Sequence, residues 1–435
     1  MSKVLRSVGL DVGTTSTQMV VSELEIENRA SQFAVPELEI RDRRVVWRSP
    51  VYFTPLLDEH HMDGEGLRRL VEEAYAQAGI TRADVDTGAV IVTGETSRKE
   101  NARTVLNALS ELAGDFVVAA AGPALESVLA AKGAGADRIS GTQPVLHMDI
   151  GGGTANLALF REGKLLQTGC LNVGGRLVKV GEAGEILYIS PVIQGIFSQK
   201  EGERISLPAA EALAEQLVRA LEMAAGLRDR GPLLDRLWTR ECETPWEIPG
   251  DRPVLSFSGG VADCIDRKHP DFAFGDIGPI LGRKIRGSAL CRGAYVLGRE
   301  TIRATVIGAG CHAAQLSGST VFYQNISFPL KNLPVAGLGE EGILAMPGVC
   351  SPSYRDIIAM AEEIVEKSGP GPVVVCVEQD MAKALGQALS ARLPREKPIL
   401  CLDRVRVGPG DYLDVGEPVG EAMPVVVKTL VMGQP

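Results

Sequence analysis

Short apolar runs alternate with amphipathic stretches along the first 135 residues of the chain. The apolar runs lie between turn signals, which is typical of strands. The stretch 64–79 predicts a helix, since its apolar residues share one face and Gly79 suits the C-terminal cap. Strands are predicted over 4–10, 17–24, 44–53, 89–93 and 116–119, and further helices over 99–112 and 123–132. This alternation predicts an α/β lobe.

A polar, glycine-bearing stretch over 135–144 precedes a second lobe, and a third segment begins near residue 305. In the second lobe we expect a strand over 164–173, helices over 209–225 and 287–302, and an irregular connection over 230–253. In the third segment we expect helices over 354–367 and 379–392 and strands over 373–377, 398–402 and 425–431. The predicted domains are therefore a first lobe over 1–140, a second over 141–304 and a C-terminal α/β segment over 305–435.

The first apolar run ends in an acid and turns through glycine into a hydroxyl-rich segment. It predicts a hairpin whose tip offers backbone N–H groups and hydroxyls to an anion such as phosphate. Asp11 lies where it could bind Mg²⁺, which favours one or two carboxylates together with water and substrate phosphates. The candidate phosphate-binding residues are Gly13, Thr14, Thr15 and Ser16.

A second copy of this pattern begins at His147. An apolar strand carries Asp149 near its end, a Gly/Thr turn follows, and a second apolar strand leaves the turn. The candidate phosphate-binding residues here are Gly151, Gly152, Gly153 and Thr154. Two such hairpins, about one domain length apart, predict two similar lobes that bind one nucleotide, each contributing an acid to the metal. We expect His147 to be a packed, hydrogen-bonded residue rather than a base.

A third element follows at 253–263, where an apolar strand is followed by Gly259 and Gly260. Glycines at such a turn allow a flat group such as adenosine to approach the backbone closely. The chain has no match to the G-x-x-x-x-G-K-[ST] pattern of P-loop proteins. A Rossmann reading of 304–313 lacks the acid that is expected about 20 residues later.

Composition excludes several function classes. Hydrophobic residues make up 45% of the 435 residues and charged residues 23%, which are the values of a globular protein that is not membrane-embedded. The net charge of -10 disfavours nucleic acid as a partner. Eight cysteines without a close pair disfavour zinc or an iron–sulfur cluster. The N-terminus lacks the pattern of a signal peptide, so we expect a cytoplasmic protein.

The order of the three motifs resembles the actin, Hsp70 and sugar-kinase superfamily, whose phosphate-1, phosphate-2 and adenosine motifs appear in this order. The resemblance implies an α/β actin-like ATPase fold with two similar lobes around a nucleotide cleft, binding ATP or ADP with Mg²⁺. Gly174 and Gly175 stand where chaperones of the superfamily carry a Gly-Gly pair after phosphate-2. Those chaperones also place an acid before a Pro ahead of phosphate-2. Here Gly122 precedes Pro123 and the nearest acid is Glu126, so the resemblance implies slow turnover, with Glu126, Asp11 and Asp149 as candidate catalytic residues.

Longer stretches resemble a narrower family, the reactivating factors of ethanolamine ammonia-lyase. The stretches that carry this resemblance are 7–18, 49–55, 92–96, 114–119, 274–279, 303–310, 378–380 and 410–412. The resemblance covers nearly the whole chain and implies an ATP-dependent chaperone whose client is that adenosylcobalamin enzyme. Nucleotide turnover would loosen the lyase, release damaged cobalamin and let intact coenzyme bind.

Several points remain open at this level. Both subunit types of the lyase are candidate contacts, and the oligomeric state and any association with a bacterial microcompartment are not given by the sequence. A small-molecule kinase or an actin-like filament protein of the same superfamily is the alternative, to be distinguished by phosphorylation of a small substrate or by ATP-dependent sedimentation.

Overall fold

The chain forms two compact units, one of residues 1–120 with 309–435 and one of residues 121–308. The computed structural model describes residues 3–13, 16–28, 38–58, 61–93, 101, 105, 117–120, 123–239, 248, 252–298, 301, 303–308, 314–319, 321–336, 342–405, 407–408, 411–416 and 423–429. The helix predicted over 99–112 lies outside the described residues apart from two positions. None of the described helices is long and apolar enough to cross a membrane.

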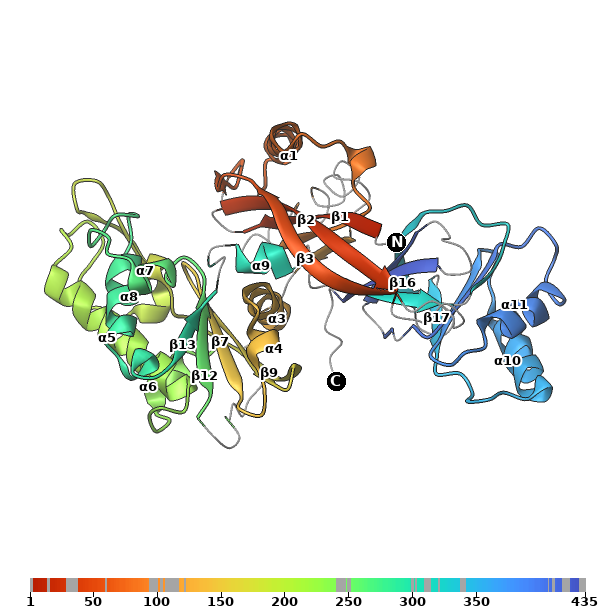
Figure 1. Ribbon diagram of the computed structural model, residues 1–435. Coiled ribbons are helices and arrows are strands. Elements are labelled where there is room, and N and C mark those ends of the chain that lie inside the picture. Colours follow the sequence, from red (N-terminus) through yellow and green to blue (C-terminus); the bar gives the residue numbers. More distant parts are fainter. Residues whose placement is uncertain are drawn as a thin grey trace. The chain divides into compact units, whose positions relative to one another are not determined.

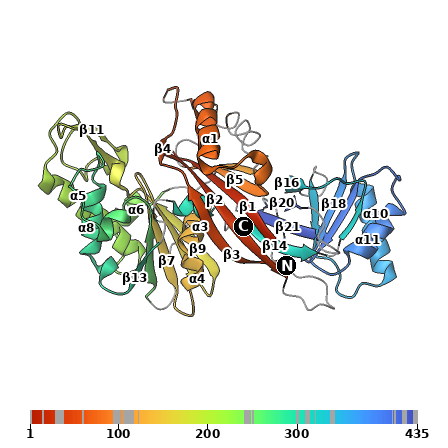
Figure 2. The same ribbon diagram turned by 45° about the horizontal axis from the view of Figure 1, so that its top comes forward.

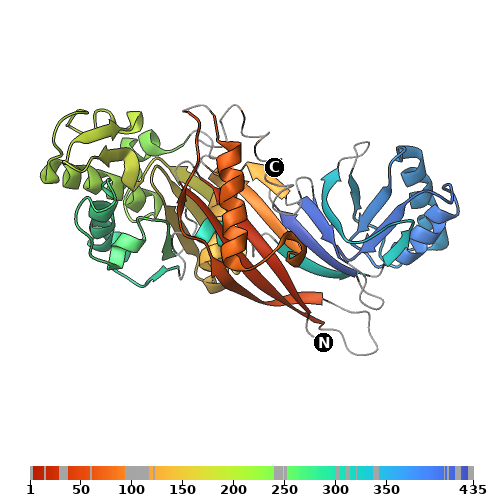
Figure 3. The ribbon, with the colours of Figure 1, turned by 90° about the horizontal axis from the view of Figure 1, so that it is seen from above.

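The N-terminal sheet of unit 1 has the strand order β3-β2-β1-β5-β6. Strands β1 (Lys3–Val12), β2 (Ser16–Asn28) and β3 (Leu38–Arg48) are antiparallel neighbours, and β5 (Thr87–Val92) and β6 (Val117–Ala120) continue the sheet in parallel. A short strand, β4 (Tyr52–Phe53), pairs with the start of β2. Helix α1 (Gly64–Ala78) lies across this sheet in Figure 3, and its buried Leu67, Val71 and Ala74 pack against β1 and β2.

The sheet of unit 2 repeats this order as β9-β8-β7-β12-β13. Strands β7 (Val145–Ile150), β8 (Ala155–Arg161) and β9 (Lys164–Leu171) are antiparallel, and β12 (Val254–Ser258) and β13 (Tyr295–Leu297) continue in parallel (Figure 1). Two lobes with the same strand order and directions confirm the predicted fold of two similar α/β lobes.

Helices cover both faces of the unit 2 sheet. On one face, α5 (Leu207–Ala224) and α8 (Gly278–Arg286) pack their apolar residues against Leu146, Met148 and Leu157. On the other, α3 (Pro123–Ala134) and α4 (Ala136–Ile139) contribute Ala131 and Ala136 to a cluster with Phe160. Because β7 is buried on both faces, every one of its residues is buried.

Smaller elements complete unit 2. The strands β10 (Val178–Val180) and β11 (Ile186–Ile189) form a separate hairpin. The short helices are α6 (Pro232–Leu237), α7 (Asp263–Asp266) and α9 (Ala304–Ile307), with single 3-10 turns at Gly175–Leu177, Pro191–Ile193 and Ala289–Cys291. Within unit 1, a further 3-10 turn lies at Arg82–Asp84.

The C-terminal residues of unit 1 form a second sheet, in the order β14-β21-β20-β16-β17-β18-β19-β15 (Figure 2). Its strands are β14 (Ala314–Ser319), β15 (Val321–Gln324), β16 (Leu330–Ala336), β17 (Ile343–Met346), β18 (Val373–Val377), β19 (Ile399–Asp403), β20 (Asp411–Val415) and β21 (Met423–Thr429). Helices α10 (Tyr354–Lys367) and α11 (Ala382–Ser390) pack on one face, where we predicted helices.

Hydrogen bonds join the N-terminal and C-terminal parts of unit 1. Thr87 donates its hydroxyl to Asp414 at 2.7 Å, and the Lys331 ammonium donates to the carbonyl of Val85 at 3.2 Å. The Thr87 and Asp414 side chains are buried, so this contact is structural rather than a surface pairing. The predicted C-terminal segment over 305–435 is therefore part of the same unit as the first lobe from residue 309 onward.

The first lobe also ends earlier than the predicted residue 140. Helix α3 packs on the unit 2 sheet, where Ser127 donates its hydroxyl to the carbonyl of Gly169 at 3.2 Å. The predicted helix over 287–302 was wrong in its described part, because Tyr295–Leu297 forms the parallel edge strand β13. Gly293 precedes a β-branched and an aromatic residue there, and strand pairing with β12 outweighs helix propensity. The connection predicted as irregular over 230–253 contains α6.

The crossing of α3 and α9 depends on glycine. A Cβ on Gly133 would lie under 3.0 Å from the Ala304 carbonyl, whereas a Cβ on Gly141 would meet nothing within 4 Å. We expect Gly133→Ala to lower the free energy of unfolding by about 1–3 kcal/mol through overpacking, despite the better helix propensity of alanine. Denaturant unfolding measures this, with Gly141→Ala as the control. Equal stability of the two variants would contradict the packing described.

Candidate functional site

The turn between β1 and β2 is closed by one backbone hydrogen bond, from the N–H of Gly13 to the carbonyl of Ser16 at 2.9 Å. The strand register places Asp11 opposite Gln18. Thr54 donates its hydroxyl to the Gly13 carbonyl at 2.7 Å and so fixes the turn from the segment after β3. Thr14 and Thr15, the other predicted phosphate-binding residues of this hairpin, lie outside the described residues.

The turn between β7 and β8 is closed by the equivalent hydrogen bond. The N–H of Gly151 donates to the carbonyl of Thr154 at 2.9 Å, and the register places Asp149 opposite Asn156. Gly153 is exposed, and a Cβ built on it would meet nothing within 4 Å. The two predicted hairpins are therefore equivalent in closure and in the position of the acid, and the second turn presents bare backbone on its surface.

Each acid is held by a hydroxyl from the neighbouring parallel strand. Thr93, directly after β5, donates to Asp11 Oδ1 at 3.1 Å, and Ser258, the last residue of β12, donates to Asp149 Oδ1. Neither hydroxyl was predicted as a site residue. Their position at the carboxyl ends of the strands beside β1 and β7 is the signal that would have found them, because parallel strands end at one edge of a sheet.

Asp149 continues into a buried hydrogen-bond chain. His147 lies fully buried between the hydroxyls of Ser256, 3.0 Å from Nδ1, and Ser258, 2.8 Å from Nε2. The single hydroxyl proton of Ser258 is donated to Asp149, so the Ser258 oxygen accepts from the Nε2–H of His147. The Nδ1 atom of His147 then carries no proton and accepts from the Ser256 hydroxyl. This confirms the expectation that His147 is a packed, hydrogen-bonded residue. Burial lowers the pKa of His147 to about 3 and raises the pKa of Asp149 to about 6.

Two glycines, Gly174 and Gly259, allow backbone to approach the second turn. A Cβ on Gly174 would lie under 3.0 Å from the Gly152 carbonyl, and one on Gly259, which has φ +90°, would lie equally close to the Ile150 carbonyl. Gly175 is similarly close to Gly278. By contrast, a Cβ on Gly260 would meet nothing within 4 Å, so that position borders open space, as an adenosine site requires.

Comparison with known proteins assigns the family. A family model described as ethanolamine utilisation protein EutA matches residues 3–345 and 337–433 of the chain. The chain belongs to the EutA family. Ethanolamine ammonia-lyase reactivase EutA of Salmonella typhimurium is 37% identical over 472 aligned positions, and that of Escherichia coli is 38% identical over 464. Each alignment covers 98% of this chain and 98% of the relative.

Solved structures match this EutA-family chain only distantly. A Ppx/GppA family member from Aquifex aeolicus has 13% identity and a TM-score of 0.39, covering 60% of this chain and 69% of that one. EutJ from Carboxydothermus hydrogenoformans has 15% identity and a TM-score of 0.36, covering 70% and 88%. The fold of two similar α/β lobes is established instead by the repeated strand order of the EutA-family chain itself.

The residues around each turn are of the kind that suits a hydrated Mg²⁺ with phosphates. Among the described residues no three His, Cys, Asp or Glu side chains are grouped as a metal cage, whereas Mg²⁺ needs only one or two carboxylates. The side-chain oxygens of Gln18 and Asn156 lie buried beside the two acids in register, and neither has a hydrogen-bond partner in the part of the chain that is described. Buried oxygens of this kind suit a ligand or its water shell.

Glu126, the third predicted catalytic acid of this EutA-family chain, lies in the first turn of α3, where we predicted the helix, and is half-buried. A carboxylate in that position also stabilises the helix dipole. Its catalytic role remains a prediction.

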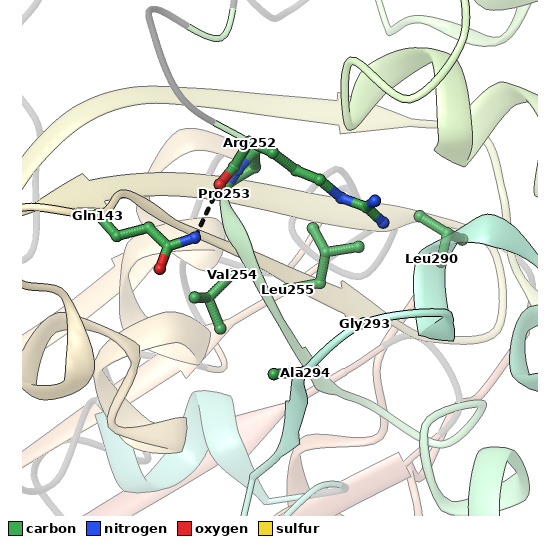
Figure 4. A pocket seen from close by; sticks show the side chains of 8 residues that line it. All are labelled: Gln143, Arg252, Pro253, Val254, Leu255, Leu290, Gly293 and Ala294. Carbon is green, nitrogen blue, oxygen red and sulfur yellow. Dashed lines mark hydrogen bonds between the residues drawn. The ribbon is translucent and has the colours of Figure 1, made fainter.

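A pocket of the second unit lies away from these residues. It has a volume of about 200 Å³ at the start of β12, the opposite end of that strand from Gly259 (Figure 4). Gln143 donates to the carbonyl of Arg252 there at 3.0 Å. The other residues that line the pocket are Pro253, Val254, Leu255, Leu290, Gly293 and Ala294. None of the predicted site residues lines this pocket.

The buried His147 predicts a defined pH dependence of stability. In the unfolded chain its imidazole takes up a proton near pH 6.5, but in the folded protein only near pH 3, so His147 lowers stability as the pH falls below 6.5. Asp149, protonated in the folded state below about pH 6, acts in the opposite direction. We expect His147→Gln to gain stability relative to the parent protein by at most about 1.4 kcal/mol per pH unit below 6.5.

Denaturant unfolding between pH 7 and pH 5 measures this difference. His61→Gln, which replaces a partly exposed imidazole in unit 1, is the control. A constant difference between His147→Gln and the parent protein across this range would show that His147 is not held neutral by burial.

Proposed function

We propose that this chain is an ATP-dependent reactivase of ethanolamine ammonia-lyase that releases damaged cobalamin so that intact adenosylcobalamin can bind. The observation that carries the proposal is its match to two reactivases over 98% of this chain and 98% of each relative. A match of this extent includes both lobes and the C-terminal sheet, so the whole architecture of the reactivase is present rather than one shared module.

The geometry of the two hairpins supports the use of ATP. Both turns are closed by the same Gly N–H bond, and both place a carboxylate at the end of a central strand. The open position at Gly260 supports an adenosine site at the end of β12. We propose that Gly13, Ser16, Gly151, Gly153 and Thr154 contact the phosphates of ATP or ADP. The same role is proposed for Thr14 and Thr15.

Asp11 and Asp149 would hold Mg²⁺ together with the nucleotide. The metal would neutralise charge that develops on the phosphates during hydrolysis. The described residues then have distinct tasks: Thr93 and Ser258 orient the two carboxylates, and Glu126 is the candidate for positioning water. Since Glu126 lies inside the helix rather than ahead of it, we propose that turnover is slow.

Nucleotide turnover can act on a client only if the ATP and ADP states differ in their affinity for it. We propose that the lyase is this client, and that either of its subunit types binds the ATP and ADP states with different affinity. We further propose that the reactivase acts in the cytoplasm, associated with the microcompartment that contains its client.

The decisive measurement is recovery of lyase activity. Ethanolamine ammonia-lyase inactivated with cyanocobalamin is incubated with this protein, Mg²⁺, ATP and fresh adenosylcobalamin, and ammonia production is followed. We expect recovery with ATP and none with a non-hydrolysable analogue. ATP hydrolysis without recovery would exclude this client, and phosphorylation of ethanolamine would indicate a kinase instead.

The two acids provide the matched test of the nucleotide site. Asp11→Asn and Asp149→Asn keep the side-chain shape and the hydroxyl contact but remove the charge, so we expect Mg²⁺-dependent ATP turnover to fall by at least about tenfold. Unfolding temperatures without nucleotide should change little. Asp235→Asn, at an exposed position, is the control. Unchanged turnover in both variants would contradict the assignment.

A further inference from the structure

Arg176 is fixed to the second turn by its own backbone. Its N–H donates to the Gly152 carbonyl at 2.6 Å, and the N–H of the preceding Gly175 donates to the Gly151 carbonyl at 3.1 Å. The backbone of Arg176 is therefore held in a fixed position against the second turn. Its side chain is 39% exposed, so part of it faces solvent.

The stem of the Arg176 side chain lies along the turn. A Cβ on Gly152 would meet the Arg176 side chain at 3.1 Å from Cδ and 3.3 Å from Cγ. The middle glycine of the turn thus leaves the space that this stem occupies. Glycine at position 152 therefore leaves room for the Arg176 side chain, in addition to leaving the backbone accessible to a phosphate.

The guanidinium is held by a buried acid. Nε of Arg176 lies 3.5 Å from Asp276 Oδ2, and the other carboxylate oxygen accepts from the N–H of Gly278 at 2.8 Å. Asp276 is 7% exposed, and burial raises its pKa. An arginine is thus positioned at the turn by a carboxylate that is itself fixed by the start of α8.

The charge balance of the site calls for such a cation. The stretches 8–18, 147–160 and 253–265 contain Asp11, Asp149 and Asp263 but no Lys or Arg. A nucleoside di- or triphosphate brings several negative charges to these motifs, and Mg²⁺ offsets only part of them. A planar guanidinium donates to phosphate through two parallel N–H groups, which suits it to this task.

We propose that Arg176, positioned by Asp276, binds the phosphate chain of the nucleotide and favours di- and triphosphates over monophosphates. The assignment rests on the proposed nucleotide use of the hairpins and adds a residue that no motif contains. It also gives a role to the Asp-Ile-Gly-Pro stretch at 276–279, because that stretch supplies the acid and the N–H that hold the arginine.

The test compares the affinities of the full chain for MgATP, MgADP and AMP by titration calorimetry. Loss of a charge-assisted hydrogen bond predicts that Arg176→Gln binds MgATP and MgADP about 10- to 100-fold more weakly. AMP affinity should change by less than about twofold, since AMP lacks the outer phosphates. The salt dependence of MgATP binding should also become shallower in Arg176→Gln, because one ion pair with the ligand is lost.

The control is Arg283→Gln, since Arg283 forms an ion pair with Asp271 in the same unit and its side chain is 38% exposed. Because Arg176→Gln leaves Asp276 buried without its cation, the double variant Arg176→Gln/Asp276→Asn provides a neutral pair, and the same loss is expected. If both variants bind MgATP as tightly as the parent protein does, the role of Arg176 is overturned, while the proposed nucleotide use of the hairpins stands. A parent protein that binds none of the three nucleotides would overturn the proposed nucleotide use and this assignment together.

Discussion

The candidate site depends on close backbone packing around the second hairpin turn, between β7 and β8. Two segments meet residues 150–152 there, and the approach is possible only because Gly174 and Gly259 have no side chains. The N–H groups of Gly175, Arg176 and Val261 then donate to the carbonyls of residues 151, 152 and 150. The phosphate role proposed for this turn requires N–H groups that are directed outward, and hydrogen bonds to the carbonyls of the same peptide units favour that orientation.

The two hairpins differ in how firmly they hold their acids. Asp11 is partly exposed and accepts a hydrogen bond from the Thr93 hydroxyl, whereas Asp149 is buried and accepts from the Ser258 hydroxyl, which is itself bonded to His147. A side chain fixed through a chain of buried partners has few alternative rotamers, while one near solvent can adjust. The lobes therefore share a topology, while the acid of the second lobe is the more deeply buried of the two.

The sequence was sufficient for elements whose pattern is local. The hairpins were predictable because an apolar strand, an acid and a Gly/Thr turn follow one another directly, and α1, α5 and α10 because their apolar residues keep a helical period. Interactions between distant segments were not predictable. Ser258 and Asp149, which form a hydrogen bond, are 109 positions apart in the sequence. The sequence places α3 at the end of the first lobe, whereas in the structure its small residues pack on β7 and β8 of the second. The strand β13 was missed for a related reason, since its residues suit a strand but its pairing with β12, a distant segment, decides the structure.

The division of unit 1 into two stretches of chain has a consequence for how the protein is made. Residues 121–308 are contiguous, so unit 2 can close as soon as it has left the ribosome. Unit 1 cannot, because Thr87 must wait for Asp414, 327 positions later, before its buried hydroxyl finds an acceptor. The first lobe is therefore synthesised first, while its buried contact with the C-terminal sheet is completed last. Long-range closure of this kind is slow, so the nascent first lobe spends the longest time with its apolar strands exposed.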